Sequence, residues 1–190
     1  MAQKSGRYWV AWANAHATNS ADVNALDADF KAKVEAFIQA LKAAGATVII
    51  AAIRRNPKRA YLFHWAWMIS QGKCAPGDPA PMQGVDIEWD HGDLKRSEAG
   101  AKEMVDGFGL AVPPASFNPP SLISNHINGQ AIDMTITWTG TIRIRKKDGT
   151  VIDVPYQSNP DTNTLLQEVG ASYGVKKLKT DRPHWSYNGK

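Results

Sequence analysis

The stretch from residue 124 to residue 133 constrains the fold more than any other part of the chain. It reads Ser-Asn-His-Ile-Asn-Gly-Gln-Ala-Ile-Asp. The Asn-Gly pair at 128–129 is the strongest short-range signal for a two-residue hairpin turn, because both residues tolerate positive φ. Side chains alternate between the faces of a strand. In a hairpin here, one face would therefore carry the side chains of Ser124, His126, Ala131 and Asp133. His126 and Asp133 would be diagonal neighbours on that face.

Length and composition indicate one globular domain. The chain has 190 residues, of which 43% are hydrophobic and 21% charged, which is ordinary for a folded domain with a substantial core. No internal repeat or separating linker is visible in the sequence. We therefore predict a single domain over residues 1–190, with its core at about 27–190 and an N-terminal extension at 1–26.

Charge, cysteine content and hydropathy exclude several classes of protein. The net charge of +4 favours an anionic partner surface, such as a bacterial wall or a nucleic acid. The basic run at 143–147 fits a strand entering a turn, so no nucleic-acid partner is predicted. No run reaches the roughly 20 apolar residues of a membrane span, and residues 1–20 lack the apolar core of a signal peptide. Cys74 is the only cysteine, so a metal site must use His, Asp and Glu.

Hydrophobic periodicity and turn residues predict alternating helices and strands. Residues 8–12 suggest an opening strand or a segment packed on the domain, and residues 73–96 form a long loop. Helices are expected at 27–44, from Pro57 to about 72, from a Ser97 cap to about 108, and at 161–173. Strands are expected at 46–53, 134–138, 141–145, 151–154 and 175–180.

Two histidines and one carboxylate leave a tetrahedral zinc ion with one open position, which is the arrangement of a catalytic site. His126 and Asp133 would supply two of these ligands. The third would come from His16, His64, His91 or His184. Only His184 follows a proline, lies beside aromatic residues and has an acidic residue, Asp181, three positions before it. The residues alone leave open whether His126, Asp133 and His184 form one site or have separate structural roles.

The pattern Ser-x-His-x-x-Gly-x-Ala-x-Asp at 124–133, followed by Asp-x-x-His-aromatic at 181–185, resembles a known family. These motifs are similar to those of zinc D-alanyl-D-alanine carboxypeptidases and dipeptidases and of L-alanyl-D-glutamate endolysins. Arg55-Asn56-Pro57 matches a third element, an arginine two residues before a helix-opening proline. The resemblance runs from about residue 30 to the C-terminus, but it leaves out 73–96 and the proline-rich approach to the first motif.

The resemblance implies a fold and a set of roles. The fold would be of the hedgehog and D-Ala-D-Ala peptidase type: α+β, with an antiparallel sheet that carries the zinc site and helices packed on it. His126, Asp133 and His184 would bind Zn²⁺, Asp181 would act as general base, and Ser124 would contact the substrate. Arg55 would stabilise the oxyanion, or Arg54 if the alignment shifts by one residue. Trp185 would line the substrate cleft or, on an equal footing, belong to the core.

The implied function is that of a hydrolase: a zinc-dependent peptidoglycan peptidase that cuts the stem peptide of the bacterial wall. Asp at the base position is more typical of the endolysin branch, which favours an endopeptidase of L-Ala-D-Glu type. A D-Ala-D-Ala carboxypeptidase or dipeptidase is the first alternative, and loop 73–96 would decide between them. A non-catalytic, zinc-containing wall-binding module is the alternative of another class. An iron oxygenase is disfavoured, because such enzymes usually place His and Asp one residue apart on a strand.

We further predict that the protein is a monomer and acts in the periplasm or cell wall. Without a visible signal peptide, export would need lysis, a secretion machine or a leader that has been removed. If the protein is an injected effector, an inhibitor or immunity protein would be a further partner.

Overall fold

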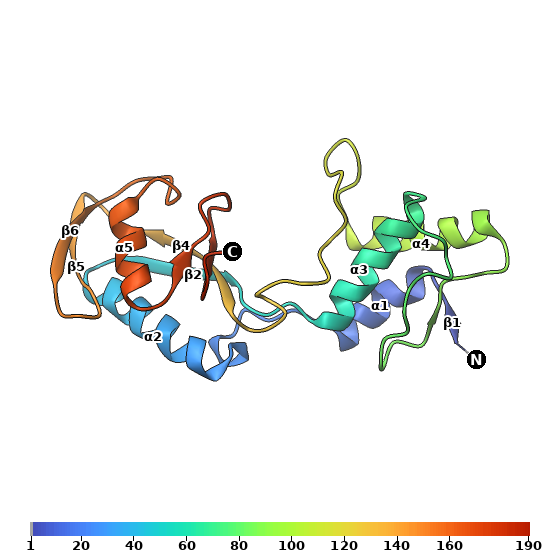
Figure 1. The fold of residues 1–190 in the computed structure, drawn as a ribbon, viewed down its shortest axis with the longest axis horizontal. Helices are drawn as coiled ribbons and strands as arrows, with labels where there is room; N and C mark the ends of the chain where they lie inside the picture. The colour runs from blue at the N-terminus through green and yellow to red at the C-terminus, as the bar shows by residue number, and fades with distance from the viewer. Residues whose placement is uncertain (1) are drawn as a thin grey trace. The chain divides into compact units, whose positions relative to one another are not determined.

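The computed structural model describes residues 2–190, which form two compact units (Figure 1). The first unit comprises residues 2–18 and 56–123, and the second comprises residues 19–55 and 124–190. Each unit has a hydrophobic core of its own. The structure thus differs from the predicted core at 27–190 with an extension at 1–26, because the N-terminal segment packs into the core of the first unit. That the whole chain acts as one metallopeptidase domain stays a prediction.

The first unit is mainly helical. Its elements are β1 (Gln3–Lys4), α1 (Arg7–His16), α3 (Pro57–Ser70), β3 (Ile87–Glu88) and α4 (Leu94–Phe108). The suggested strand at 8–12 is wrong, because this segment lies within α1 and buries Trp9 against the other helices. Helix α3 begins at Pro57 as predicted. Helix α4 begins earlier than predicted: Asp93 caps it by accepting from the Arg96 N–H, and Ser97 lies inside the helix.

The second unit holds most of the strands. Its helices are η1 (Val23–Ala25), α2 (Ala28–Ala43) and α5 (Thr164–Ser172), and its strands are β2 (Thr47–Ala52), β4 (Ala131–Thr137), β5 (Thr141–Arg145), β6 (Val151–Pro155), β7 (Lys176–Lys177) and β8 (His184–Ser186). Strands β2, β4, β8 and β7 form one antiparallel sheet in that order, and β5 pairs with β6 in a separate hairpin. The predicted α+β class is confirmed, while the hedgehog type stays a prediction.

The two faces of the four-stranded sheet have different surroundings. On one face Ile132, Met134 and Trp185 join the core that α2 and α5 complete. Alternation places Asp133 on the other face, where it pairs in register with His184. Further along this face Ile49, which pairs with Thr135, is 61% exposed. Strand alternation therefore puts two candidate ligands on the face of the sheet opposite the core.

The predicted hairpin at 124–133 is wrong. Residues 125–129 form turns, and only Ala131 begins a strand. Both edges of β4 near Asp133 are already used, since β2 pairs on one side and β8 on the other. The segment before residue 130 has no strand edge left to join. It folds as a compact loop, in which the Gln130 N–H donates to the Asn125 carbonyl at 2.8 Å.

No helix within residues 2–190 has both the length and the apolar content needed to cross a bilayer.

Candidate metal centre

The side chains of His126, Asp133 and His184 meet on the exposed face of the sheet. His126 Nε2 lies 3.1 Å from Asp133 Oδ1 and 3.1 Å from His184 Nδ1, and these last two atoms are also 3.1 Å apart. Three potential ligand atoms thus stand at the corners of an equilateral triangle. In a tetrahedral zinc site with bonds of about 2.0–2.1 Å, ligand atoms stand about 3.3–3.4 Å apart. The group is therefore close to the spacing that a metal ion requires.

Backbone carbonyls select which ring nitrogens face the centre of this triangle. His126 Nδ1 lies 2.7 Å from the Ile53 carbonyl, and His184 Nε2 lies 3.1 Å from the Lys190 carbonyl. A carbonyl oxygen only accepts, so each of these nitrogens carries the proton of the neutral ring. His126 Nε2 and His184 Nδ1 then present lone pairs. Such backbone partners fix the tautomer of metal-binding histidines.

The centre of the triangle thus receives two imidazole lone pairs and a carboxylate oxygen. Acceptors that face one another in a poorly hydrated site need a cation between them, either a proton or a metal ion. His126 and His184 are both 8% exposed, so water screens them poorly. Among residues 2–190 these three side chains form the one group of His, Cys, Asp and Glu that could hold a metal ion. The donor set suits zinc, and it also suits iron(II).

The ionisation of Asp133 and His126 reflects this arrangement. Burial pushes the pKa of Asp133 upward, but the His126 and His184 rings, which donate to its carboxylate when their facing nitrogens are protonated, outweigh burial and hold the pKa well below its usual range. Burial pulls the pKa of His126 downward, but hydrogen bonds to Asp133 and to the Ile53 carbonyl outweigh it and leave the pKa raised. Asp133 is thus a carboxylate at neutral pH, as a metal ligand must be.

The loop that carries His126 is held by its own sequence. Ser124 Oγ accepts from the His126 N–H at 3.1 Å, and this closes the first turn. Gly129 adopts φ +70°, and a Cβ there would lie 2.8 Å from the Asp27 nitrogen at the start of α2. Only glycine fits this close approach. The glycine and serine of the motif therefore have structural roles here, and a substrate contact by Ser124 stays a prediction.

Arg55 is the better placed of the two candidate arginines. Its N–H donates to the His126 carbonyl at 3.2 Å, and its guanidinium is near enough to oppose protonation of the His126 ring. The guanidinium of Arg54 lies 3.5 Å from the Ala25 carbonyl, on an exposed side chain. The structure thus brings Arg55 to the metal centre and turns Arg54 to another part of the unit.

Asp181 lies on the turn before β8, three residues from His184. Its carbonyl accepts from the His184 N–H at 3.0 Å, while its side chain is exposed and outside the metal-binding group. A buried ammonium fixes this turn: Lys177 Nζ donates to the carbonyls of Leu178 and Asp181 and pairs with Asp161 at 2.8 Å. Lys177 and Asp161 are not among the predicted site residues, because neither lies in a recognised motif.

Trp185 belongs to the core. It is fully buried, and its ring lies 5.4 Å from that of Phe37. Trp185 follows His184 in β8, and neighbouring residues of a strand point to opposite faces, so the Trp185 side chain points into the core. Of the two roles considered for Trp185, the structure places it in the core, although the residue also lines a cavity that none of the three metal-binding side chains lines.

The other three histidines lie in the first unit and have partners or settings of their own. His64 Nδ1 lies 2.8 Å from the Pro120 carbonyl, and His91 Nε2 lies 2.9 Å from Ser5 Oγ. His16 is exposed at the end of α1, next to Trp12. Of the four histidines considered as third ligand, His184 is the one that joins His126 and Asp133.

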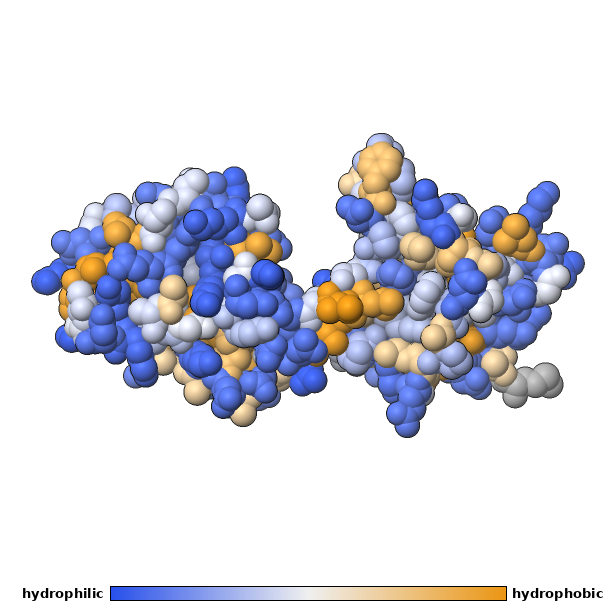
Figure 2. Space-filling model, viewed as in Figure 1, coloured by the Kyte–Doolittle hydropathy of each residue, from blue (hydrophilic) through white to orange (hydrophobic). Residues whose placement is uncertain are grey.

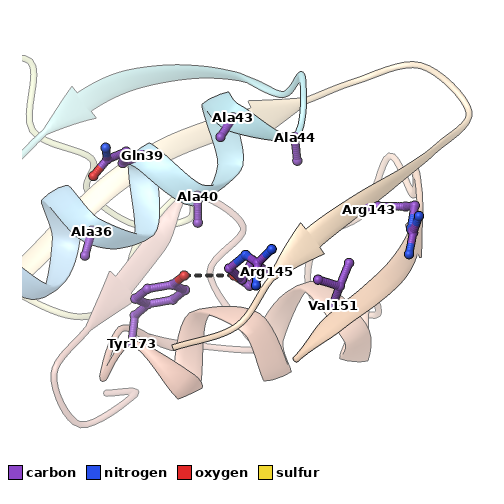
Figure 3. Close-up of a pocket in the computed structure, with 9 residues that line it drawn as sticks. All are labelled: Ala36, Gln39, Ala40, Ala43, Ala44, Arg143, Arg145, Val151 and Tyr173. Carbon is purple, nitrogen blue, oxygen red and sulfur yellow. Dashed lines mark hydrogen bonds between the residues drawn. The ribbon is translucent and has the colours of Figure 1, made fainter. Parts of the chain in front are cut away.

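A broad hollow of about 580 Å³ lies elsewhere on the second unit (Figure 3). Figure 3 shows alanines of α2 facing the β5–β6 hairpin, with the Tyr173 hydroxyl donating to the Arg145 carbonyl at 2.8 Å. None of the three metal-binding side chains lines this hollow. We therefore assign the chemistry to the His-Asp-His group and not to this surface.

Neither a scan against protein-family models nor a search of curated proteins found a match to this chain.

Proposed function

We propose that the protein is a zinc-dependent peptidase of the bacterial cell wall. The observation that carries this proposal is the convergence of three acceptor atoms, all 3.1 Å apart, on the face of the sheet opposite the core. Zinc bound there would lower the pKa of a bound water toward about 7 and polarise the carbonyl of a peptide bond. A tetrahedral zinc ion held by these three side chains would keep one position for a water or a substrate.

The chain supplies two further groups of the kind that such a reaction needs. The Asp181 carboxylate is exposed, on a turn that Lys177 holds next to His184. It would accept a proton from the attacking water and pass it to the leaving amine. The Arg55 guanidinium, whose charge reaches the His126 ring, would donate to the carbonyl oxygen as negative charge develops on it.

The distribution of charge supports an anionic wall polymer as the surface on which the protein works. The second unit has fourteen Lys and Arg against ten Asp and Glu, whereas the first has eight of each. The entire net charge of +4 thus belongs to the unit with the metal centre. Figure 2 shows that hydrophilic residues cover most of the visible face of this unit. We propose the stem peptide as substrate, with cleavage of the L-Ala-D-Glu type and action in the periplasm or wall.

A second candidate is a zinc-containing wall-binding module without catalysis. The observation that favours it is the exposed Asp181 side chain, which lies outside the metal-binding group. The two candidates differ in whether a substrate is cut, which a direct assay decides.

The test is to incubate the full chain, loaded with zinc, with defined muropeptides and to weigh the products by mass spectrometry. The expected result is a cut between L-Ala and D-Glu, and a cut at D-Ala-D-Ala would instead assign the carboxypeptidase alternative. His126→Ala should be inactive, and His16→Ala, at an exposed histidine of the first unit, should be as active as the wild type. Intact muropeptides after incubation with zinc-loaded wild type would refute the peptidase. Metal analysis of protein purified without added metal would identify the ion.

A further inference from the structure

One edge of strand β4 is open beyond Met134, the residue that follows the ligand Asp133. Strand β8 pairs only with Ala131–Asp133, and the last contact is the Met134 N–H donating to the Pro183 carbonyl at 2.9 Å. The chain then turns away at Arg182. Among residues 2–190 no strand pairs with Thr135–Thr137 on this side.

Alternation along the strand identifies the groups on this edge. The Met134 N–H points toward the β8 side, and residues two apart direct their backbone groups to the same side. The N–H and C=O of Ile136 therefore face the open edge. An extended peptide that pairs there would continue the line of β8, in the mode known as strand addition.

A cavity of about 320 Å³ lies along this edge. Its lining combines the open strand with the β6–α5 loop and the segment before β8, and it includes Met134, Ile136, Tyr156, Arg182, Pro183 and Trp185. Sites for small ligands start at about 300 Å³, so the cavity has room for a short stretch of peptide. Alternate side chains of an added strand would point toward the buried Met134 and Trp185.

The cavity and the metal centre use neighbouring residues of the same two strands. Met134 follows the ligand Asp133, and Pro183 and Trp185 are the neighbours of the ligand His184. Neighbouring residues of a strand point to opposite faces, so the cavity is a binding surface separate from the ligand triangle, and none of the three ligands lines it.

Arg182 gives the cavity a charge preference. It is the one ionisable residue other than Tyr156 among the lining residues, and no Asp or Glu lines the cavity. Its side chain is exposed, and none of the ion pairs among residues 2–190 involves it. Guanidinium groups bind carboxylates through two parallel hydrogen bonds.

We infer that this cavity is a subsite for an extended peptide with a free carboxylate: the peptide would add to the edge of β4 at Ile136 and place its carboxylate on Arg182. The inference rests on the proposed function only for the identity of the peptide, the acidic stem peptide of the wall. It concerns binding, so it can be tested in the absence of cleavage.

The experiment uses the full chain without metal, so that no probe is cut. One probe is L-Ala-γ-D-Glu-L-Lys with its C-terminus amidated, so that the α-carboxylate of D-Glu is its one free carboxylate. The matched probe has D-isoglutamine in place of D-Glu, which replaces that carboxylate by an amide. Calorimetry should show wild type binding the acid on the order of tenfold more tightly than the amide, as charge-assisted hydrogen bonds would give. Arg182→Gln should bind both probes equally, and Arg182→Lys should keep part of the preference.

Arg143→Gln is the matched control, because Arg143 is an exposed arginine of the same unit, paired with Asp153, outside the cavity. It should retain the full preference. A second readout tests the strand addition: binding of the acid should slow hydrogen exchange at the Ile136 amide. An NMR spectrum of Arg182→Gln that matches the wild type away from the cavity would show that this variant folds.

Equal binding of the two probes by wild type, an unchanged preference in Arg182→Gln, or unchanged exchange at Ile136 would each overturn the inference. Its failure is distinct from that of the proposed function. If muropeptides are cut but hydrogen exchange at the Ile136 amide is not slowed, the peptidase proposal stands and the subsite is refuted. If the acid binds and slows hydrogen exchange at the Ile136 amide, but zinc-loaded protein cuts nothing, the subsite stands and the peptidase proposal is refuted.

Discussion

Zinc should stabilise the wild-type protein strongly, and this gain should depend on His126. The three ligand atoms are already 3.1 Å apart, near the spacing of a tetrahedral site, so little of the binding free energy is spent on reorganisation. Zinc at 1,000 times its Kd should add about 4 kcal/mol to the free energy of unfolding. For a chain of this size that corresponds to a rise in Tm of about 8–16 °C.

The assay is thermal unfolding followed by circular dichroism, with and without zinc. His126→Ala should lose most of the zinc-induced rise, while the exposed His16→Ala should keep it. The comparison uses the zinc-induced difference, because loss of the buried imidazole also lowers the stability of the metal-free protein. An equal rise in His126→Ala and wild type would refute the assignment of the metal centre.

The zinc-induced rise in Tm should become smaller as the pH falls, because protons and zinc compete for the same atoms. The pKa of His126 is raised, so protonation of its ring begins to compete at a higher pH than for an ordinary histidine. The pKa of Asp133 is lowered, so its carboxylate stays available throughout this range. Zinc-induced stabilisation that is unchanged between pH 8 and pH 5 would contradict this reasoning.

Three further predictions concern the chemistry and the loop. Asp181→Asn should lower kcat on muropeptides by about 10²–10⁴-fold while zinc affinity is retained, as expected for a general base; an unchanged kcat would remove Asp181 from the mechanism. Arg55→Gln should lower kcat by about 10²–10³-fold, whereas Arg54→Gln should have little effect, and equal losses would contradict the assignment of Arg55. Gly129→Ala should destabilise the protein in urea by more than Gly140→Ala, because both glycines have φ near +70° but only Gly129 would meet backbone atoms within 3 Å; equal losses would show that the contact with Asp27 does not matter.

The ligand set was predictable from the sequence, but the local structure around it was not. The spacing of His126 and Asp133 fitted both a hairpin and a compact loop, and both arrangements bring the two side chains together. The hairpin failed because β2, which lies about 80 residues earlier in the chain, occupies one edge of β4. A local turn signal contains no information about such a distant partner.

Long regular elements were predicted better than short ones. Helix α2 and strand β2 fall close to the predicted 27–44 and 46–53, because hydrophobic periodicity and Gly45 mark them clearly. Helix α1 was not recognised, since its short aromatic run fits a strand equally well. Lys177 was also beyond prediction, because the role of a buried ammonium depends on the carbonyls and the carboxylate that fold around it.

The division of the chain into two units has a consequence for its folding. Residues 56–123 lie between two segments of the second unit that meet at the metal centre, where the Arg55 N–H donates to the His126 carbonyl. They are therefore an insertion, whose ends leave and return at neighbouring points. The entropy of closing such a loop grows only with the logarithm of its length, so a fourfold change in length costs about 1 kcal/mol. The sheet and its ligands thus set few limits on the length of this insertion, whereas its content is constrained by the core that it shares with residues 2–18.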